Sequence, residues 1–241
     1  MKIYFIPFDK KLFTTIGIII LVVIILFVLF SFKSISTFGH APIYEAQTGR
    51  DEIALTCNVV WGTEYIPSIL DVLKNENVKM TFYIGGKWAE ENPELLKRIY
   101  QEGHEIGNHG YDHQKPTKIS DEDNKNEITK AEQVIEKTIG VKPTLFAPPY
   151  GDIDDRTTEI AENLEYKVVM WNIDTIDWKY KDNPQMIHDR IFNNENELEG
   201  GIVLMHPTDG TLKALPSIIK DVKAKGIDIV TVSELIKKQG L

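Results

Sequence analysis

The feature that most constrains the fold of this chain is an alternation of short apolar runs with helix-like segments. The apolar runs are expected to form strands at 53–58, 78–84, 104–109, 143–151, 166–173, 200–206 and 227–232. Such alternation predicts parallel strands joined by right-handed helical crossovers. About seven strand–helix units suit an α/β fold that is a distorted or incomplete (β/α) barrel of parallel strands, with an open doubly wound sheet as the alternative.

The N-terminal part of the chain has a different character. Residues 12–32 form a run of 21 residues without a charge, which is long enough to cross a bilayer core of roughly 30 Å. A buried core helix of this length should show a polar face, and none is present. The apolar region of a cleavable signal peptide is normally about 7–15 residues long, so cleavage after the run is the weaker alternative.

The charges around this run predict its orientation. Lys10 and Lys11 precede it and only Lys33 follows directly, which favours an N-terminus inside the cell. We therefore expect one N-terminal transmembrane helix and a single-pass protein of the cell membrane. Its parts would be a short cytoplasmic N-terminus at 1–11, the anchor at 12–32, a stalk at 33–50 and an extracytoplasmic domain at 51–241.

The charge and motif content of the domain argues against several function classes. Residues 1–33 carry a net charge of +3, so the rest of the chain carries −12. Nucleic-acid binding requires cationic surface to replace phosphate counterions, and we expect none here. No predicted strand is followed by a glycine-rich phosphate-binding motif, so no nucleotide cofactor is expected. The single cysteine, Cys57, excludes an internal disulfide and a cysteine-based zinc cluster.

Polar side chains gather after the predicted strands, where parallel α/β folds keep their chemistry. His109 and His113 could share a cation from one face of a helical turn, or simply lie on a solvated helix face. Asp174 could orient a catalytic histidine beside the sugar-binding wall of Trp178, or cap a turn beside a core tryptophan. His206 is either a core histidine or a general acid held by a carboxylate.

Five segments, in this order, resemble the motifs of the polysaccharide deacetylases, which are carbohydrate esterase family 4 or the NodB-homology domain. They are TFYIGG (81–86), EGHEIGNHGYDH (102–113), FAPPYG (146–151), DTIDW (174–178) and VLMHP (203–207). The resemblance covers roughly residues 50–240, and LMHPT with FAPP is most similar to the sporulation-associated subgroup of endospore formers. It implies a divalent metal, usually zinc, and hydrolytic removal of acetyl groups from N-acetylated cell-wall polysaccharide such as peptidoglycan.

The resemblance also implies a role for individual residues. A metal-bound water would attack the acetyl carbonyl after losing its proton to a carboxylate. His109 and His113 would be metal ligands, and His206 would protonate the leaving amine while Asp174 tunes it. The residues expected to contact substrate are Pro149, Tyr150, Trp178 and Leu204, with the backbone amide of Tyr150 sharing the oxyanion.

The first motif departs from the family pattern T-F-D-D-G, which supplies a base aspartate and then a metal-ligand aspartate. These positions fall on Asn58 and Val59, and the arginine of the usual R-P-P-Y-G is Ala147. An amide cannot take the proton, and loss of a general base costs on the order of 10²–10⁴ in rate. Glu64 could replace a missing carboxylate, or it could only favour the start of the next helix.

Two hypotheses about function therefore stand. The chain is a membrane-anchored, metal-dependent deacetylase of cell-wall glycan, or it is a catalytically degenerate relative that binds glycan or serves as a structural surface protein.

Overall fold

The structure is a computed structural model of the whole chain, and it describes residues 15–16, 18–24, 41–46, 51–192 and 198–237. The chain divides into two units, residues 1–38 and 39–241. Within the membrane span expected at 12–32, only residues 15–16 and 18–24 are described, as helix; the rest lies outside the described residues. None of the described helices has the length and apolar content needed to cross a membrane.

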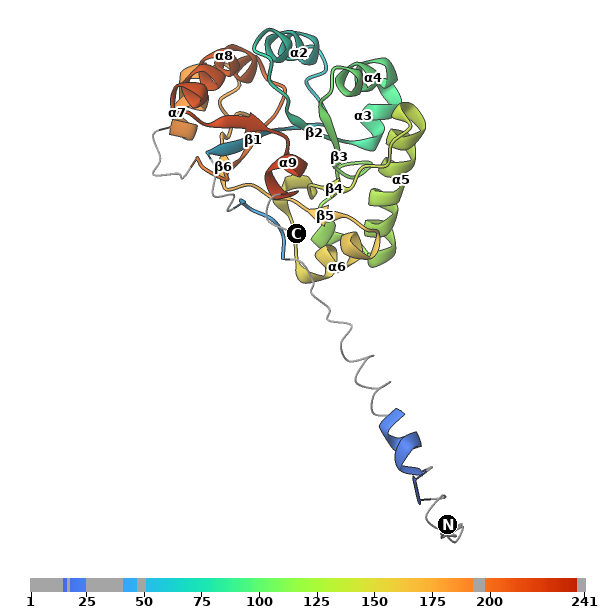
Figure 1. Cartoon of the computed structure of the whole chain (residues 1–241). Helices are drawn as coiled ribbons and strands as arrows, with labels where there is room; N and C mark the ends of the chain where they lie inside the picture. Colours follow the sequence, from blue (N-terminus) through green and yellow to red (C-terminus); the bar gives the residue numbers. More distant parts are fainter. Residues whose placement is uncertain (1–14, 17, 25–40, 47–50, 193–197, 238–241) are drawn as a thin grey trace, which may run out of the picture. The chain divides into compact units, whose positions relative to one another are not determined.

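The second unit is built around one sheet in which every strand pair is parallel (Figure 1). Its strands are β1 (Glu52–Val59), β2 (Thr81–Ile84), β3 (Glu105–Asn108), β4 (Leu145–Phe146), β5 (Lys167–Val168), β6 (Ile173–Asp174), β7 (Ile202–Met205) and β8 (Asp228–Val230). Their order is β5-β4-β3-β2-β1-β7-β6, and β8 pairs with the start of β1. No pairing joins β5 to β6 among the described strands, so the predicted incomplete barrel is confirmed.

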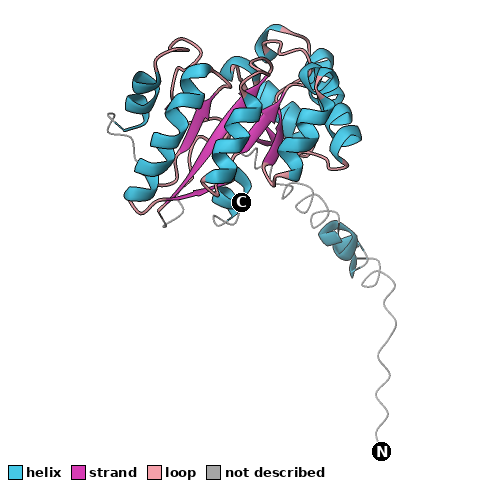
Figure 2. Cartoon of the chain, turned by 90° about the horizontal axis from the view of Figure 1, so that it is seen from above, coloured by secondary structure: helices cyan, strands magenta, loops and turns pink. Residues whose placement is uncertain are grey.

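Helices cover the outer side of the curled sheet, as Figures 1 and 2 show from two directions. They are α2 (Ile66–Asn75), α3 (Gly86–Glu91), α4 (Pro93–Gln101), α5 (Asp121–Ile139), α6 (Asp155–Asn163), α7 (Pro184–Phe192) and α8 (Asp209–Ala224). Short 3₁₀ turns η1 (Pro116–Lys118) and η2 (Pro149–Gly151) interrupt two loops. The last helix, α9 (Val232–Lys237), packs Leu235 with Ala54 and Ile202 in the core on the inner side.

Local sequence signals account for both ends of α5. Ser120 accepts a hydrogen bond from Asp123 N at 3.2 Å, which satisfies one of the free amides of the first turn. At the other end, Gly140 takes a left-handed conformation with φ of 76°, which glycine adopts without the steric cost of a Cβ atom.

The side chains of β1 alternate between two apolar cores, one on each face of the sheet. One set, Ile53, Leu55, Cys57 and Val59, belongs to the large core between the sheet and the outer helices. Ala54 belongs to the inner core, and the period of two places Thr56 and Asn58 on the same inner face. Adjacent positions 58 and 59 therefore face opposite sides of the sheet.

Part of the expected stalk belongs to the domain. Residues 41–46 are the described portion of 33–50. Ile43 N donates to Val168 O at 2.9 Å, and Ile43 O accepts from Met170 N at 2.7 Å. Ala46 N donates to Gly200 O at 2.7 Å, and Ala46 is buried. This segment therefore extends the sheet edge beside β5.

Two strand predictions were too long. The run 143–151 forms only the two-residue strand β4 before its prolines. The run 166–173 was expected to be one strand, but it forms β5 and β6, which lie at opposite edges of the sheet. Between them, Val169 bridges to Ile43. An apolar run is buried in either arrangement, so its composition did not reveal the break.

We predict that His104 makes the domain less stable in mild acid. Its ring is buried, and Nδ1 accepts a hydrogen bond from Met80 N at 3.2 Å. Burial, assisted by Lys79, lowers the pKa of His104 to about 4. Below a pH of about 6.5 the unfolded chain binds this proton and the folded chain does not, so stability falls between about pH 6.5 and pH 4.

Urea unfolding measured across this pH range tests the prediction with His104→Asn, which retains an acceptor but cannot titrate. The free energy of unfolding of the variant should depend less on pH than that of the unchanged chain. Equal pH slopes would contradict the assignment.

Candidate functional site

One cavity of about 440 Å³ collects most of the residues singled out from the sequence. It is lined by Asn58, Trp61, His109, His113, Tyr150, Trp171, Asp174, Trp178, Leu204 and His206. All predicted site residues are in this set except Pro149, which is buried beside Gly110. Most of these residues lie at or just beyond the carboxyl ends of strands, which is the edge of the sheet where the sequence analysis placed the candidate site.

A loop, and not a helical turn, brings the two imidazoles of His109 and His113 together. The loop leaves β3 at Asn108 and includes two residues with positive φ, Gly110 at 72° and His113 at 56°. The ring centroids lie 5.0 Å apart. The expected helical face was therefore wrong, although the two rings do meet.

Hydrogen bonds to the backbone hold this loop in shape. Asn108 Oδ1 accepts from Gly110 N at 2.9 Å. Glu127 of α5 accepts with Oε2 from Tyr111 N at 3.1 Å and from Asp112 N at 2.8 Å. The loop backbone is thereby fixed by side chains from a neighbouring strand and helix.

The tautomer of His109 follows from its surroundings. Its Nδ1 lies 2.6 Å from the carbonyl oxygen of Ala147, which can only accept, so Nδ1 carries the proton. Burial, together with nearby His113, lowers the pKa of His109 to about 3. Burial and nearby His206 lower the pKa of His113 to about 4. Both imidazoles are neutral near pH 7, and the Nε2 lone pair of His109 is free of the Ala147 contact.

The carboxylate that holds His206 is Asp177, which corrects the expectation of Asp174. Asp177 is fully buried, and its Oδ1 lies 2.8 Å from His206 Nδ1. Its Oδ2 accepts from His206 N at 2.5 Å and from Thr211 Oγ1 at 2.6 Å. The chain turns after β6 through Ile176, with φ of 51°, so the later aspartate reaches the histidine.

Asp174 has a different environment from Asp177. Its carboxylate lines the cavity, and Oδ1 accepts from Ile176 N at 2.8 Å. Within the described part of the chain, no lysine or arginine forms an ion pair with this carboxylate. The guanidinium of Arg190 instead donates from Nε to the backbone carbonyl oxygen of Asp174 at 2.7 Å. The carboxylate therefore adds negative charge to the cavity without forming an ion pair among the described residues.

Exposed aromatic rings form the rim of the cavity. Trp61, Tyr150 and Trp178 are 37%, 62% and 51% exposed. Trp61 stacks on the imidazole of His206 with 5.6 Å between ring centroids and 7° between ring planes. Trp61 and Trp171 were not predicted as site residues. The sequence did place Trp61 three residues after Asn58, in the loop after β1, and this position could have indicated that it lies at the site.

The residues present do not fit a catalytic zinc site. Such a site normally takes three protein ligands, and no group of three or more metal-binding side chains occurs within the described ranges. Val59 faces the outer apolar core. Glu64 is exposed and lines a neighbouring cavity of about 380 Å³ with Trp61 and Lys181, away from the two histidines. The proposed replacement by Glu64 is therefore not observed.

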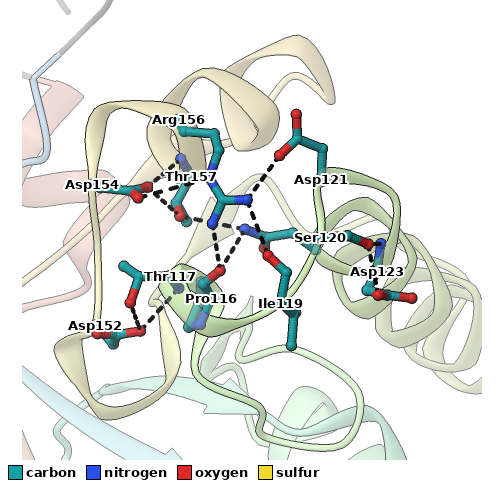
Figure 3. Close-up of polar contacts among 11 residues, drawn as sticks. Pro116, Thr117, Ile119, Ser120, Asp121, Asp123, Asp152, Asp154, Arg156 and Thr157 are labelled. Carbon is teal, nitrogen blue, oxygen red and sulfur yellow. Dashed lines mark hydrogen bonds and ion pairs between the residues drawn. The ribbon is translucent and has the colours of Figure 1, made fainter.

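A polar network joins the loop after His113 to the loop after Tyr150 (Figure 3). Thr117 donates from its N and Oγ1 atoms to Asp152 Oδ2 at 2.9 and 2.7 Å. Arg156 of α6 donates to the carbonyl oxygens of Pro116 and Ile119, both at 3.0 Å, and to the carboxylate of Asp121 at 2.8 Å. Two loops that border the cavity are thus tied together.

Comparison with known proteins agrees with this fold and this arrangement of residues. A family model described as "Polysaccharide deacetylase" matches residues 45–169. The chain belongs to the polysaccharide deacetylase family. This is a family of carbohydrate hydrolases, and the resemblance inferred from the sequence motifs is confirmed.

Individual relatives of this deacetylase-family chain differ in what their names state. The uncharacterized protein YlxY of Bacillus subtilis is 38% identical over 83% of this chain and 62% of its own length. A peptidoglycan-N-acetylglucosamine deacetylase of Bacillus cereus is 35% identical over 82% of this chain and 73% of its own. This chain thus spans about three fifths of the length of YlxY.

A solved structure is similar in fold as well as in sequence. BA3943 from Bacillus anthracis, described as a CE4 family pseudoenzyme, matches with a TM-score of 0.77 and 37% identity. The match covers 81% of this chain and 68% of that one.

We predict that a carboxylate restores metal binding at position 58 but not at position 59. Asn58 lines the cavity with the two histidines, so Asn58→Asp supplies a third ligand and should tighten zinc binding more than about tenfold. Val59→Asp instead buries a carboxylate in the outer core, lowering the free energy of unfolding by about 3 kcal/mol or more without tightening zinc binding.

Competition with a fluorescent zinc chelator measures the affinity, and urea unfolding measures the stability. Tight zinc binding by a stable Val59→Asp variant would show that the two faces of β1 are assigned incorrectly.

Proposed function

We propose that this chain binds a cell-wall glycan of amino sugars in its cleft without appreciable deacetylation. The observation that carries the proposal is Asn58, an amide at the cavity position where the family supplies a base. With no third metal ligand among the described residues and no base, the cleft has aromatic walls but lacks the groups that activate water. The pseudoenzyme description of BA3943 and the peptidoglycan-directed names of other relatives support the same proposal.

The residues of the cleft suit a sugar ring. Trp178 and Tyr150 present exposed rings on which the apolar face of a pyranose stacks. Leu204 adds apolar surface at the wall, and Asp174 with His206 provides polar groups that fix orientation. These residues bind and orient a glycan, and none of them requires a metal to do so.

A slow metal-assisted deacetylase is the second candidate. Two observations favour it: the retained contact between His206 and Asp177, and the Nδ1–H of His109 directed at Ala147 O. The first suits a general acid and the second suits an imidazole that binds a cation through Nε2. A weakly held divalent ion at His109 and His113 would then be needed for any turnover.

We also propose that residues 12–32 anchor the chain in the cell membrane with the domain outside. The uncharged run of 21 residues and the lysines before it support this placement. A glycan-binding domain held there would meet the cell wall directly. The sporulation context suggested by the sequence motifs stays a prediction.

The two candidates are separated by measuring acetate release and glycan binding on the same preparation. We predict that the full chain in detergent, given zinc and N-acetylated peptidoglycan, releases no more acetate than its His206→Ala variant. It should nevertheless bind the glycan, and Trp178→Ala should weaken binding about two- to tenfold through the loss of one stacking contact.

Tyr100→Ala is the matched control, because Tyr100 is an exposed aromatic residue on α4 that is not among the cavity-lining residues. Zinc-dependent acetate release that disappears in His206→Ala would instead establish the second candidate.

A further inference from the structure

Several polar groups of the cavity are hydrogen-bond acceptors. Because His109 Nδ1 donates to Ala147 O, its Nε2 offers a lone pair. The carboxylate of Asp174 can only accept, and no described lysine or arginine forms an ion pair with it, because Arg190 Nε donates to the backbone oxygen of that residue at 2.7 Å. The ring of His113 lines the same cavity, with its centroid 5.0 Å from that of His109.

Asn58 adds an unpartnered group to the same cavity. Its side chain is 3% exposed, and no described residue forms a hydrogen bond with its Oδ1 atom. A buried amide oxygen without a partner is costly in a folded protein. Turning the amide so that Oδ1 faces the cavity would let a ligand that donates hydrogen bonds remove that cost.

Two lysines lie near aromatic rings at the rim of the cavity. Lys115 Nζ is 5.2 Å from the centroid of the Tyr150 ring, and Lys181 Nζ is 5.3 Å from that of Trp61. Neither lysine is among the cavity-lining residues. The interior therefore contains the charge of Asp174 and several lone pairs, facing rings that also attract cations.

We propose that the cleft selects glycan whose amino sugar carries a free ammonium group over the fully N-acetylated form. The inference rests on the proposed function, since it names the state of the sugar bound at that same site. An ammonium brings three N–H donors and a positive charge to Asp174, His109 and Asn58. An acetamide brings one N–H donor and a carbonyl acceptor, which leaves buried acceptors of the cavity unsatisfied.

With this selection, the site retains a binding function although the family's two aspartates are replaced by Asn58 and Val59. Two imidazole lone pairs that do not suffice for a catalytic zinc ion can accept hydrogen bonds from an ammonium group. The cleft then recognises the product of deacetylation and does not perform it.

The test compares two tetrasaccharides that differ by one group. One is the fully N-acetylated tetramer of glucosamine, and the other is the same tetramer with a single free amine. Calorimetric titration uses the full chain in detergent with a metal chelator present, at about pH 6, where a sugar ammonium is protonated. We expect the amine-bearing tetramer to bind at least about tenfold more tightly.

The variant Asp174→Asn keeps the shape of the site and its contact with Ile176 N while removing the charge. It should reduce the preference to about twofold or less. The matched control is Asp228→Asn. Asp228 is an exposed residue of β8, and its backbone lies opposite that of Glu52 in the strand register, at the end of β1 far from the cavity. If Asp174→Asn does not fold, His113→Phe is the second variant, and it should reduce the preference about threefold.

The outcomes separate two failures. Equal or tighter binding of the fully N-acetylated tetramer overturns this inference and leaves the proposed glycan binding intact. An equal loss of preference in Asp174→Asn and Asp228→Asn would mean general attraction to an acidic domain, and it also overturns the inference. Absence of binding by both tetramers overturns the proposed function itself.

Discussion

The hydrogen-bonded register of β1 is the constraint on which the rest of the site depends. The strand pairs with β7 on one side and, on the other, with β8 at its start and β2 at its end, so it cannot slide without breaking the ladders on both sides. A slip by one residue would also exchange its two faces. With this register, Asn58 faces the cavity and Val59 faces the outer core. The chemistry available to the cleft is therefore decided by one inward-facing amide.

The remaining cavity residues are positioned mainly by loops whose backbone is held by polar side chains. Glu127 fixes the loop of His113 from α5, and Arg156 ties the following segment to α6. Asp177 orients His206 through the contact between its Oδ1 and His206 Nδ1. These contacts keep the cleft ordered although the first motif has changed. They also explain how a chain can retain the shape of a hydrolase site after losing part of its chemistry.

The sequence predicted the fold class and nearly all residues of the cavity, because strand ends in a parallel sheet meet at one edge. It did not predict connections decided by backbone turns. Asp174 is the last residue of β6 and Asp177 lies three residues later, beyond the left-handed Ile176, and it is Asp177 that reaches His206. The run 166–173 is mostly apolar, yet it contributes to two strands at opposite edges of the sheet. Trp61 was visible in the sequence, but its stacking on His206 depends on two loops meeting in space.

Under the proposed function, this deacetylase fold binds glycan in its cleft and lacks, among the described residues, the groups that activate water. An X-ray structure of the chain crystallised with zinc and a saturating N-acetylated tetrasaccharide tests this claim most directly. We expect a sugar ring of this tetrasaccharide to stack against Trp178 and Tyr150, with the acetyl groups of the ligand intact, and no zinc ion to be held by three protein side chains. A zinc ion held by a third side chain beside His109 and His113, together with a de-N-acetylated sugar, would contradict it.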